Sequence, residues 1–313
     1  MGSTSSELEG VISIGAWGSR SGGDPWSYKP NTASPIREII FFHEGGNIKS
    51  ISFKHQDSFI SGGFGGRDPN DRGTSETRIT LRTPSEYLKS ISGTYGVYNG
   101  VADVILSLSF HTNLSTYVPF GRPSNTGTPF TIPMEDSVVV GFHGRAGYYL
   151  DAIGIYVKPL NPRGSISLGT WGGPKGDPFG FMVGTTSWIK QIIIRHDSNI
   201  KALSFKDEND HNYGIFGGKN PNDLGREAII EFDGRSEFLT SISGTYGSYV
   251  NYASVITSLL FETNLNTYGP FGREIGTTFS LPIMRGAVVV GFHGKSNIYI
   301  DSIGIYVRPR TVG

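Results

Sequence analysis

The strongest constraint on the fold is that the chain contains the same series of short motifs twice. Three of the pairs are SISGTYG at 90–96 and 241–247, VVVGFHG at 138–144 and 288–294, and IGIYV at 153–157 and 303–307. The two members of each pair lie about 150 positions apart, and the order is the same in both halves. Solenoids and propellers repeat every 20–50 residues or so, so this spacing predicts a tandem duplication of one whole domain.

The predicted domains cover residues 8–158 and 164–310, and a proline-rich linker joins them. Within each domain, apolar and polar residues alternate over short runs such as IKSISFKH at 48–55. This period of two, in runs rich in Val, Ile, Phe, Thr and Tyr, is typical of half-buried β-strands. No segment combines a helical period with capping residues. We therefore predict an all-β chain with a sandwich, barrel or prism in each half.

The composition argues against several classes of function. Basic and acidic residues number 27 each, so no excess charge directs the chain to nucleic acid. The chain has no cysteine, which excludes disulfides, thiolate metal sites and cysteine nucleophiles. No apolar run reaches the roughly 18 residues that span a membrane, and the N-terminus lacks the apolar core of a signal peptide. We expect a cytoplasmic or nucleocytoplasmic protein without membrane insertion.

The sequence shows no repeated catalytic or metal-binding set. Of seven histidines, only His143 and His293 occupy equivalent positions, each in GFHG at the end of an apolar run, where a packed histidine is the favoured interpretation. Motifs of zinc proteases, serine hydrolases and phosphate-binding loops are absent. The segments FGGRDPND at 64–71 and FGGKNPND at 216–223 lack the ligand spacing of a calcium loop and are interpreted as turns. We expect neither a metal nor a cofactor.

One aspartate in each half stands out. Asp151 and Asp301 directly precede the repeated apolar strand, in RAGYYLD and KSNIYID. Each half also has a glycine-rich loop, WGSRSGGDPW at 17–26 and WGGPKGDPF at 171–179, whose backbone N–H groups no side chain shields. A sugar could donate hydroxyl hydrogens to such a carboxylate and accept hydrogen bonds from backbone amides. From the residues alone, a turn-stabilising role for the aspartates is equally open.

The glycine-rich loops, SGTYG, TNLSTYVPFG and TNLNTYGPFG, GFHG and the G-x-x-x-D loop together resemble the jacalin-related lectins. The resemblance covers both halves in the motif order of the family. It implies two tandem β-prism I domains, each built from three four-stranded Greek-key sheets around a pseudo-threefold axis. It also implies one metal-free carbohydrate site at one end of each prism.

In the first domain, the resemblance implies that Gly23 donates its N–H group to a ring hydroxyl. Tyr148 and Tyr149 would donate main-chain N–H groups toward the ring oxygen and the primary hydroxyl. Asp151 would accept from two hydroxyls, and Gly147 would allow the tight conformation of the loop. Tyr95 and Tyr98, in and just after the first SGTYG, and Tyr246 and Tyr249 in the second half either extend the site to a second sugar ring or pack between sheets.

In the second domain, the matching residues are Gly176, Asn297, Ile298, Tyr299 and Asp301. Asn297 replaces the glycine of the motif. Because Asn tolerates positive φ better than most residues, we expect the loop to survive with a narrower site. Some family members have a second carbohydrate site in each domain, with another G-x-x-x-D motif in the loop between the third and fourth strands. The corresponding segments at 46–50 and 198–202 lack that aspartate, so one site per domain is expected.

Each glycine-rich loop continues from a preceding strand without a break in the chain. This continuity resembles the mannose/glucose-binding branch of the family, whose members are not cleaved at this loop. The predicted function is therefore an agglutinin of plant-defence type that cross-links mannose- or glucose-containing glycans and glycoproteins, with homo-oligomers adding valency. Galactose specificity, which the aromatic Tyr148 and Tyr149 leave open, is one alternative. A non-sugar interaction scaffold with a vestigial second site is another. An enzyme is not predicted, because glycosidases typically need two carboxylates and only Asp24 and Asp177 could supply a partner.

Overall fold

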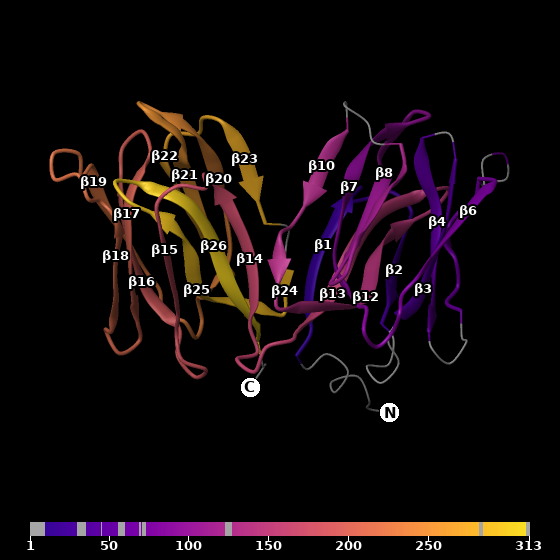
Figure 1. The fold of residues 1–313 in the computed structure, drawn as a ribbon, viewed down its shortest axis with the longest axis horizontal. Helices are drawn as coiled ribbons and strands as arrows, with labels where there is room; N and C mark the ends of the chain where they lie inside the picture. Colours follow the sequence, from indigo (N-terminus) through magenta and orange to yellow (C-terminus); the bar gives the residue numbers. More distant parts are fainter. Residues whose placement is uncertain are drawn as a thin grey trace. The chain divides into compact units, whose positions relative to one another are not determined.

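The computed structural model describes residues 10–29, 36–44, 46–55, 60–68, 70, 73–122, 127–281 and 284–310. Every regular element in these ranges is a β-strand, which confirms the predicted all-β class (Figure 1). The described residues contain no helix, and therefore no apolar helix long enough to cross a membrane. The chain divides into two compact units, Met1–Leu160 and Asn161–Gly313.

The first unit arranges twelve of its strands in three sets of four. In spatial order, the first set is β2 (Asp24–Tyr28), β12 (Ser137–Ala146), β13 (Leu150–Pro159) and β1 (Ile12–Gly18). The second is β10 (Thr128–Thr131), β7 (Leu88–Tyr98), β8 (Val101–Thr112) and β9 (Thr116–Gly121). The third is β5 (Phe64–Gly65), β4 (Asn47–His55), β3 (Ile36–Glu44) and β6 (Ser75–Thr80).

The second unit repeats this arrangement. Its first set is β14 (Ile166–Gly172), β26 (Ile300–Pro309), β25 (Ala287–Ser296) and β15 (Asp177–Met182). The second is β22 (Thr267–Gly272), β21 (Tyr252–Thr263), β20 (Leu239–Tyr249) and β23 (Thr277–Ser280). The third is β18 (Asn212–Gly217), β17 (Ile200–Asp207), β16 (Ile189–His196) and β19 (Arg226–Glu231). Two short strands, β11 (Met134–Glu135) and β24 (Met284–Arg285), complete the secondary structure.

Each set of four strands has Greek-key order, in which three neighbouring strands are followed by a fourth that pairs with the first. The order β10-β7-β8-β9 shows this directly. The first set closes the same pattern with strands from both ends of the unit, because β12 and β13 pair with β2 and β1. Three four-stranded Greek-key sheets per domain are therefore confirmed.

Aromatic side chains from the three sheets meet inside the first unit. Phe41 of β3 and Phe110 of β8 have ring centroids 5.8 Å apart, and Phe53 of β4 stacks on Phe142 of β12 at 4.4 Å. All four rings are fully buried. Burying one such side chain contributes about 1.5–3 kcal/mol, so these contacts hold the sheets around a common core.

The repeated histidines belong to this packing. The Nε2 atom of His143 lies 3.0 Å from the hydroxyl of Ser13, and a Cβ atom on Gly154 would lie 2.3 Å from Cε1 of His143. His293 has the same two neighbours in the second unit, Ser167 at 3.0 Å and Gly304. The motifs GFHG and IGIYV therefore form one packing unit, which confirms the interpretation of these histidines as packed residues.

Candidate functional site

Two loops of the first unit meet at one end of its first sheet. One contains residues 19–23 between β1 and β2, and the other contains residues 147–149 between β12 and β13. Strand β12 pairs with both β13 and β2, so Ala146 lies next to Leu150 on one side and Asp24 on the other. The amide of Ser19 also donates to the carbonyl oxygen of Asp151 at 2.9 Å. The sheet thus brings the glycine-rich loop and the G-x-x-x-D loop together, as the resemblance implied.

Asp151 is the buried acid between these loops. It is only 4 % exposed, and its Oδ2 atom has no hydrogen-bond partner among the described residues. Burial raises the pKa of Asp151, while the backbone of Gly147 and the charge of Arg145 act in the opposite direction. A buried oxygen without a donor is unfavourable in the free protein. A ligand hydroxyl that donates to this oxygen would remove that cost.

Gly23 lies directly against this carboxylate. Its φ is +57°, and a Cβ atom built on it would lie 2.3 Å from Oδ2 of Asp151 and 2.4 Å from the carbonyl carbon of Ala146. Only glycine combines the left-handed conformation with this close approach. The predicted pair of Gly23 and Asp151 is therefore in contact, although the two residues are far apart in the sequence.

The two tyrosines of the G-x-x-x-D loop have different surroundings. The side chain of Tyr148 is 61 % exposed, whereas that of Tyr149 is 3 % exposed and its phenol donates to Asp68 at 3.2 Å. The amide of Gly147 donates to the carbonyl oxygen of Tyr149 at 3.0 Å, which closes the turn. Tyr148 is thus available at the surface, and Tyr149 anchors the loop to the domain.

Arg145, which the sequence analysis did not select, fixes the glycine-rich loop from the other side. Its guanidinium donates to the carbonyl oxygens of Gly22 at 2.7 Å and Gly23 at 2.6 Å. These carbonyls cannot be inferred from residue types, so the only available signal was a basic residue two positions before the G-x-x-x-D motif in both halves. Lys295 is its counterpart and donates to the carbonyl oxygen of Pro174 at 2.6 Å.

The second domain builds the same site with Asp301. This aspartate is 4 % exposed, and a Cβ atom on Gly176 would lie 2.5 Å from its Oδ2 atom. Burial raises the pKa of Asp301. The amide of Asn297 donates to the carbonyl oxygen of Tyr299 at 2.9 Å, which reproduces the turn of the first domain. Ile298 is half-buried at the position of the exposed Tyr148.

The expected reason for tolerating Asn297 is wrong. Neither Gly147 nor Asn297 has a positive φ, so the loop does not need the left-handed conformation there. Instead, a Cβ atom on Gly147 would lie 3.2 Å from Cα of Gly23 and 3.3 Å from Oδ2 of Asp151. The glycine of the motif therefore provides space beside the carboxylate, and a side chain at this position needs a shift of its neighbours rather than a strained backbone.

Tyr98 and Tyr249, which follow the two SGTYG motifs, pack against tyrosines of the G-x-x-x-D loops. Tyr98 meets Tyr149 edge-on at 5.2 Å and accepts a hydrogen bond from Lys49 at 3.0 Å. Tyr249 meets Tyr299 edge-on at 5.4 Å in the second domain. Of the two interpretations left open by the sequence, the packing role therefore describes Tyr98 and Tyr249.

The segments that begin with Phe-Gly-Gly border the same site. In the first domain, the amide of Asn70 donates to Asp68 Oδ1 at 2.9 Å, and in the second the amide of Asn222 donates to Asn220 at 3.1 Å. These turns confirm the predicted turn structure. Arg67 pairs with Asp24 of the glycine-rich loop at 2.5 Å. The part of the chain that the structure describes has no cluster of three or more His, Asp or Glu side chains that could hold a metal ion.

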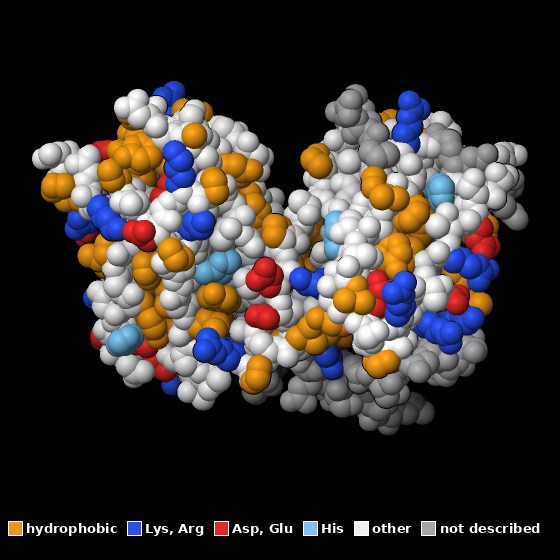
Figure 2. All heavy atoms as spheres, in the orientation of Figure 1, with side chains coloured by type: hydrophobic (Ala, Val, Ile, Leu, Met, Phe, Trp, Pro, Cys, Tyr) orange, Lys and Arg blue, Asp and Glu red, His pale blue; other side chains and the backbone are white. Residues whose placement is uncertain are grey.

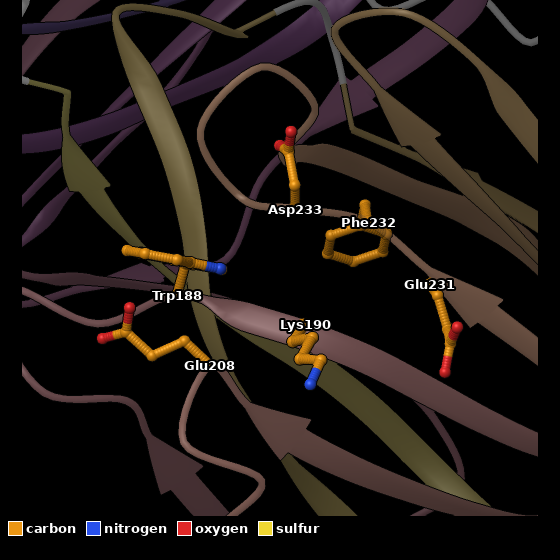
Figure 3. A pocket seen from close by; sticks show the side chains of 6 residues that line it. All are labelled: Trp188, Lys190, Glu208, Glu231, Phe232 and Asp233. Atoms are coloured by element: carbon orange, nitrogen blue, oxygen red, sulfur yellow. The ribbon is translucent and has the colours of Figure 1, made fainter.

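A pocket of about 480 Å³ lies elsewhere in the second domain (Figure 3). Its lining consists of Trp188, Lys190, Glu208, Glu231, Phe232 and Asp233. The pocket lies far from the Asp301 loop. On β17, Lys201 is close to that loop, whereas Asp207 ends the strand beside the pocket residue Glu208. The six residue steps between Lys201 and Asp207 span about 20 Å. Lys190 is paired with Asp210 at 2.9 Å, and the hydroxyl of Ser236 with three backbone amides lowers the pKa of Asp233 to about 2.

The pocket is therefore lined partly by charges that already have partners. On the face of the molecule shown in Figure 2, acidic and basic side chains are interspersed, and hydrophobic ones form small separate groups. The charged residues that line the pocket are all partly or fully exposed, unlike the buried carboxylate of Asp151. We place the candidate site at the two buried aspartates.

Comparison with known proteins agrees with this arrangement. The family model of the jacalin-like lectin domain matches residues 14–156 and again residues 168–306. A mannose/glucose-specific lectin of Parkia platycephala is 59% identical over 308 residues, which cover 97% of this chain and 66% of that protein. The chain thus spans slightly less than two thirds of the length of this relative.

Two further relatives differ more. An agglutinin of Castanea crenata is 37% identical over 326 residues, which cover 96% of this chain and 99% of that protein. The solved structure of a mannose-specific jacalin-related lectin from Morus nigra, in complex with mannose, is 35% identical. It covers 45% of this chain and 93% of its own, with a TM-score of 0.41.

Proposed function

Because the chain belongs to the jacalin-like lectin domain family and contains that domain twice, we propose that it is a mannose/glucose-binding lectin with one metal-free carbohydrate site per domain. The sugar class is supported by the relative from Parkia platycephala, which is described as mannose/glucose-specific. The sites are formed by Asp151 with the loops around Gly23, and by Asp301 with the loops around Gly176.

The observation that carries the proposal is the Oδ2 atom of Asp151, which is buried, without a partner among the described residues, and next to the backbone of Gly23. A pair of adjacent sugar hydroxyls can donate to the two oxygens of such a carboxylate in charge-assisted hydrogen bonds. Backbone N–H groups of Gly23, Tyr148 and Tyr149 would donate to the remaining oxygens of the sugar. The exposed ring of Tyr148 would lie at the rim.

The proposal describes a binding protein and not an enzyme. A glycosidase of the usual type needs a second carboxylic acid that can donate a proton. Asp177 is exposed and bonded to Lys219 at 2.8 Å, and this hydrogen bond lowers its pKa, so Asp177 stays ionised. Asp24 has an equivalent ion pair with Arg67. Release of reducing sugar from a mannan would contradict this part of the proposal.

Calorimetric titration with methyl α-mannoside and, separately, methyl α-galactoside tests the function. We expect two mannoside sites per chain, and loss of one site in each of the variants Asp151→Asn and Asp301→Asn. A preference for galactoside would change the sugar class but keep the sites. No binding of either sugar would favour an interaction scaffold.

Two sites on one chain have a further consequence for glycans with several branches. One shallow site for a single sugar is expected to bind with a Kd of roughly 1 mM, or about −4 kcal/mol. A second site on the same chain, and further sites in any homo-oligomer, raise the avidity without new contacts. We expect the unmodified chain to precipitate a branched mannan, and each single-site variant to do so much less.

A further inference from the structure

The loop that follows Phe216 supports the G-x-x-x-D loop of the second domain from behind. We call residues 216–223 the support loop and residues 295–301 the binding loop. The amide of Gly218 donates to the carbonyl oxygen of Ile298 at 3.0 Å. A Cβ atom on Gly217, whose φ is +80°, would lie 2.4 Å from the carbonyl oxygen of Lys201 and 3.3 Å from the carbonyl carbon of Tyr299. The two glycines therefore allow direct backbone contact between the loops.

A buried lysine lies below this contact. The side chain of Lys201, on β17, is 1% exposed. Its ammonium donates to Asp223 at 2.7 Å and to the phenol oxygen of Tyr249 at 3.1 Å. The same nitrogen lies 4.6 Å from the ring centre of Tyr249 and 4.8 Å from that of Tyr299. The lysine is thus enclosed by an acid of the support loop and two aromatic rings.

Tyr299 connects this cluster to the binding loop. It is 5% exposed, and its phenol donates to Asp223 at 2.6 Å. The bonds from Lys201 and Tyr299 lower the pKa of Asp223, so this carboxylate is ionised at neutral pH. Tyr299 is itself a residue of the binding loop, two positions before Asp301. The position of its ring therefore fixes the backbone that leads to the carboxylate.

The first domain has a lysine at the equivalent place. Lys49 is fully buried, donates to the phenol oxygen of Tyr98 at 3.0 Å, and lies 4.8 Å from the ring centre of Tyr149. Burying a charged group is costly, and replacing a buried ion pair by apolar residues of similar volume is often neutral or stabilising. A lysine in both halves is therefore hard to explain by core stability alone.

We propose that Lys201 is a positioning residue for the carbohydrate site, which holds the binding loop in its sugar-accepting conformation through Tyr299 and Asp223, and that Lys49 does the same through Tyr149. The inference rests on the proposed function, since it deepens the role of the same site. Lys201 does not touch the sugar in this arrangement. It fixes the ring of Tyr299, and with it the amides and the carboxylate that contact the sugar.

The experiment uses the full chain with Asp151→Asn, so that only the second site reports. In this parent, Lys201→Met keeps an unbranched side chain of similar length but removes the charge, and Tyr299→Phe removes only the phenol oxygen. Lys190→Met is the matched control, because Lys190 pairs with Asp210 away from the binding loop on the same sheet. Methyl α-mannoside affinity is measured by calorimetry, and amide hydrogen exchange is measured without sugar.

We expect Lys201→Met to lower the affinity at least tenfold and to speed exchange at residues 297–301 more than in the rest of the domain. Tyr299→Phe should have a smaller effect in the same direction, and Lys190→Met should have none. A uniform rise in exchange throughout the second domain would indicate a role in stability only and would overturn the inference. Unchanged affinity and exchange would overturn it as well.

The role of Lys201 can still be decided if the parent binds no mannoside or if Lys201→Met does not fold. If the Asp151→Asn parent binds no mannoside, the proposed function fails at the second site, and the exchange pattern at residues 297–301 alone decides whether Lys201 positions the loop. If Lys201→Met does not fold, Tyr299→Phe decides by the same two measurements. Lys49→Met in an Asp301→Asn parent repeats the experiment for the first site and should give the same pattern at residues 147–151.

Discussion

Gly23 and the carboxylate of Asp151 are so close that a Cβ atom on the glycine would lie 2.3 Å from Oδ2. A contact of this length cannot be relieved by moving a flexible side chain alone, because the same Cβ would also lie 2.4 Å from the backbone of Ala146. The glycine-rich loop can therefore approach the acid only while residue 23 has no side chain.

The first prediction follows from this contact. Gly23→Ala should lower the affinity of the first site for methyl α-mannoside at least tenfold, measured by calorimetry in a chain whose second site is silenced by Asp301→Asn. Gly62→Ala is the control, since a Cβ atom there would meet nothing within 4 Å. Equal affinities of the two alanine variants would contradict the role of Gly23.

The second prediction concerns the stability cost of the buried acids. Burial raises the pKa values of Asp151 and Asp301 in the folded chain above the ordinary value of about 3.9. The folded state then binds protons more tightly than the unfolded state, so stability falls as the pH rises through the window between the two pKa values. Asp151→Asn should therefore melt at the same or a higher temperature than the unmodified chain at neutral pH. This advantage should vanish below pH 3.9 or so, where both states are protonated.

Thermal unfolding of both proteins over this pH range checks the second prediction. A lower melting temperature of Asp151→Asn at neutral pH would show that the carboxylate stabilises the loop. Calorimetry on the same variant should show that the first mannoside site is lost. Loss of binding without loss of stability would separate the ligand-binding role of the acid from a structural one.

The third prediction is the pH dependence of sugar binding. The ionised carboxylate accepts strong, charge-assisted hydrogen bonds on both oxygens, whereas protonation turns one oxygen into a donor, so affinity should fall as the pH is lowered through the raised pKa of the free protein. The decline should therefore begin above the pH at which an ordinary aspartate titrates, near 3.9. Titration of methyl α-mannoside at a series of pH values measures the midpoint. A midpoint at or below the ordinary value would argue against burial as the dominant influence.

The fourth prediction concerns the packed histidines. A Cβ atom on Gly154 would lie 2.3 Å from Cε1 of His143 and 2.8 Å from the carbonyl oxygen of Ile14. Gly154→Ala should therefore destabilise the first domain by about 1–3 kcal/mol, as overpacking usually does. Urea unfolding measures the change against Gly62→Ala. Near-equal stabilities would mean that His143 can move away without cost.

The pattern of residues was sufficient for the all-β class and the duplication, and the resemblance supplied the three-sheet prism and the acid predicted for each site. Alternation predicted the strands, and the motif pairs predicted the two domains. The resemblance then selected Gly23 and Asp151 as neighbours. Other features depend on contacts that have no signal in residue type. Arg145 binds backbone carbonyls, and carbonyls are present at every position in any sequence.

Lys49 shows why the supporting structure could not be predicted. Residue type predicts a surface position for a lysine in IKSISFKH, although a period of two places Lys49 on the same face as Ile51 and Phe53. The pairing of β3 with β4 shifts register between Phe42 and His43, and Asn47, Ile48 and Lys49 are all buried. The register shift accompanies burial of consecutive residues, and neither the shift nor the tyrosine that accepts a hydrogen bond from Lys49 can be read from residue types.

The first sheet of each domain is assembled from both ends of that domain's sequence, since β1 and β2 pair with β13 and β12. The two loops of each proposed carbohydrate site are thus synthesised near the beginning and near the end of the domain. A ribosome that has made the glycine-rich loop must still make most of the domain before the aspartate appears. Contacts between residues so distant in sequence form slowly in folding. Under the proposed function, sugar binding would therefore require a finished domain, and a domain that ends before its aspartate would have no affinity for glycans.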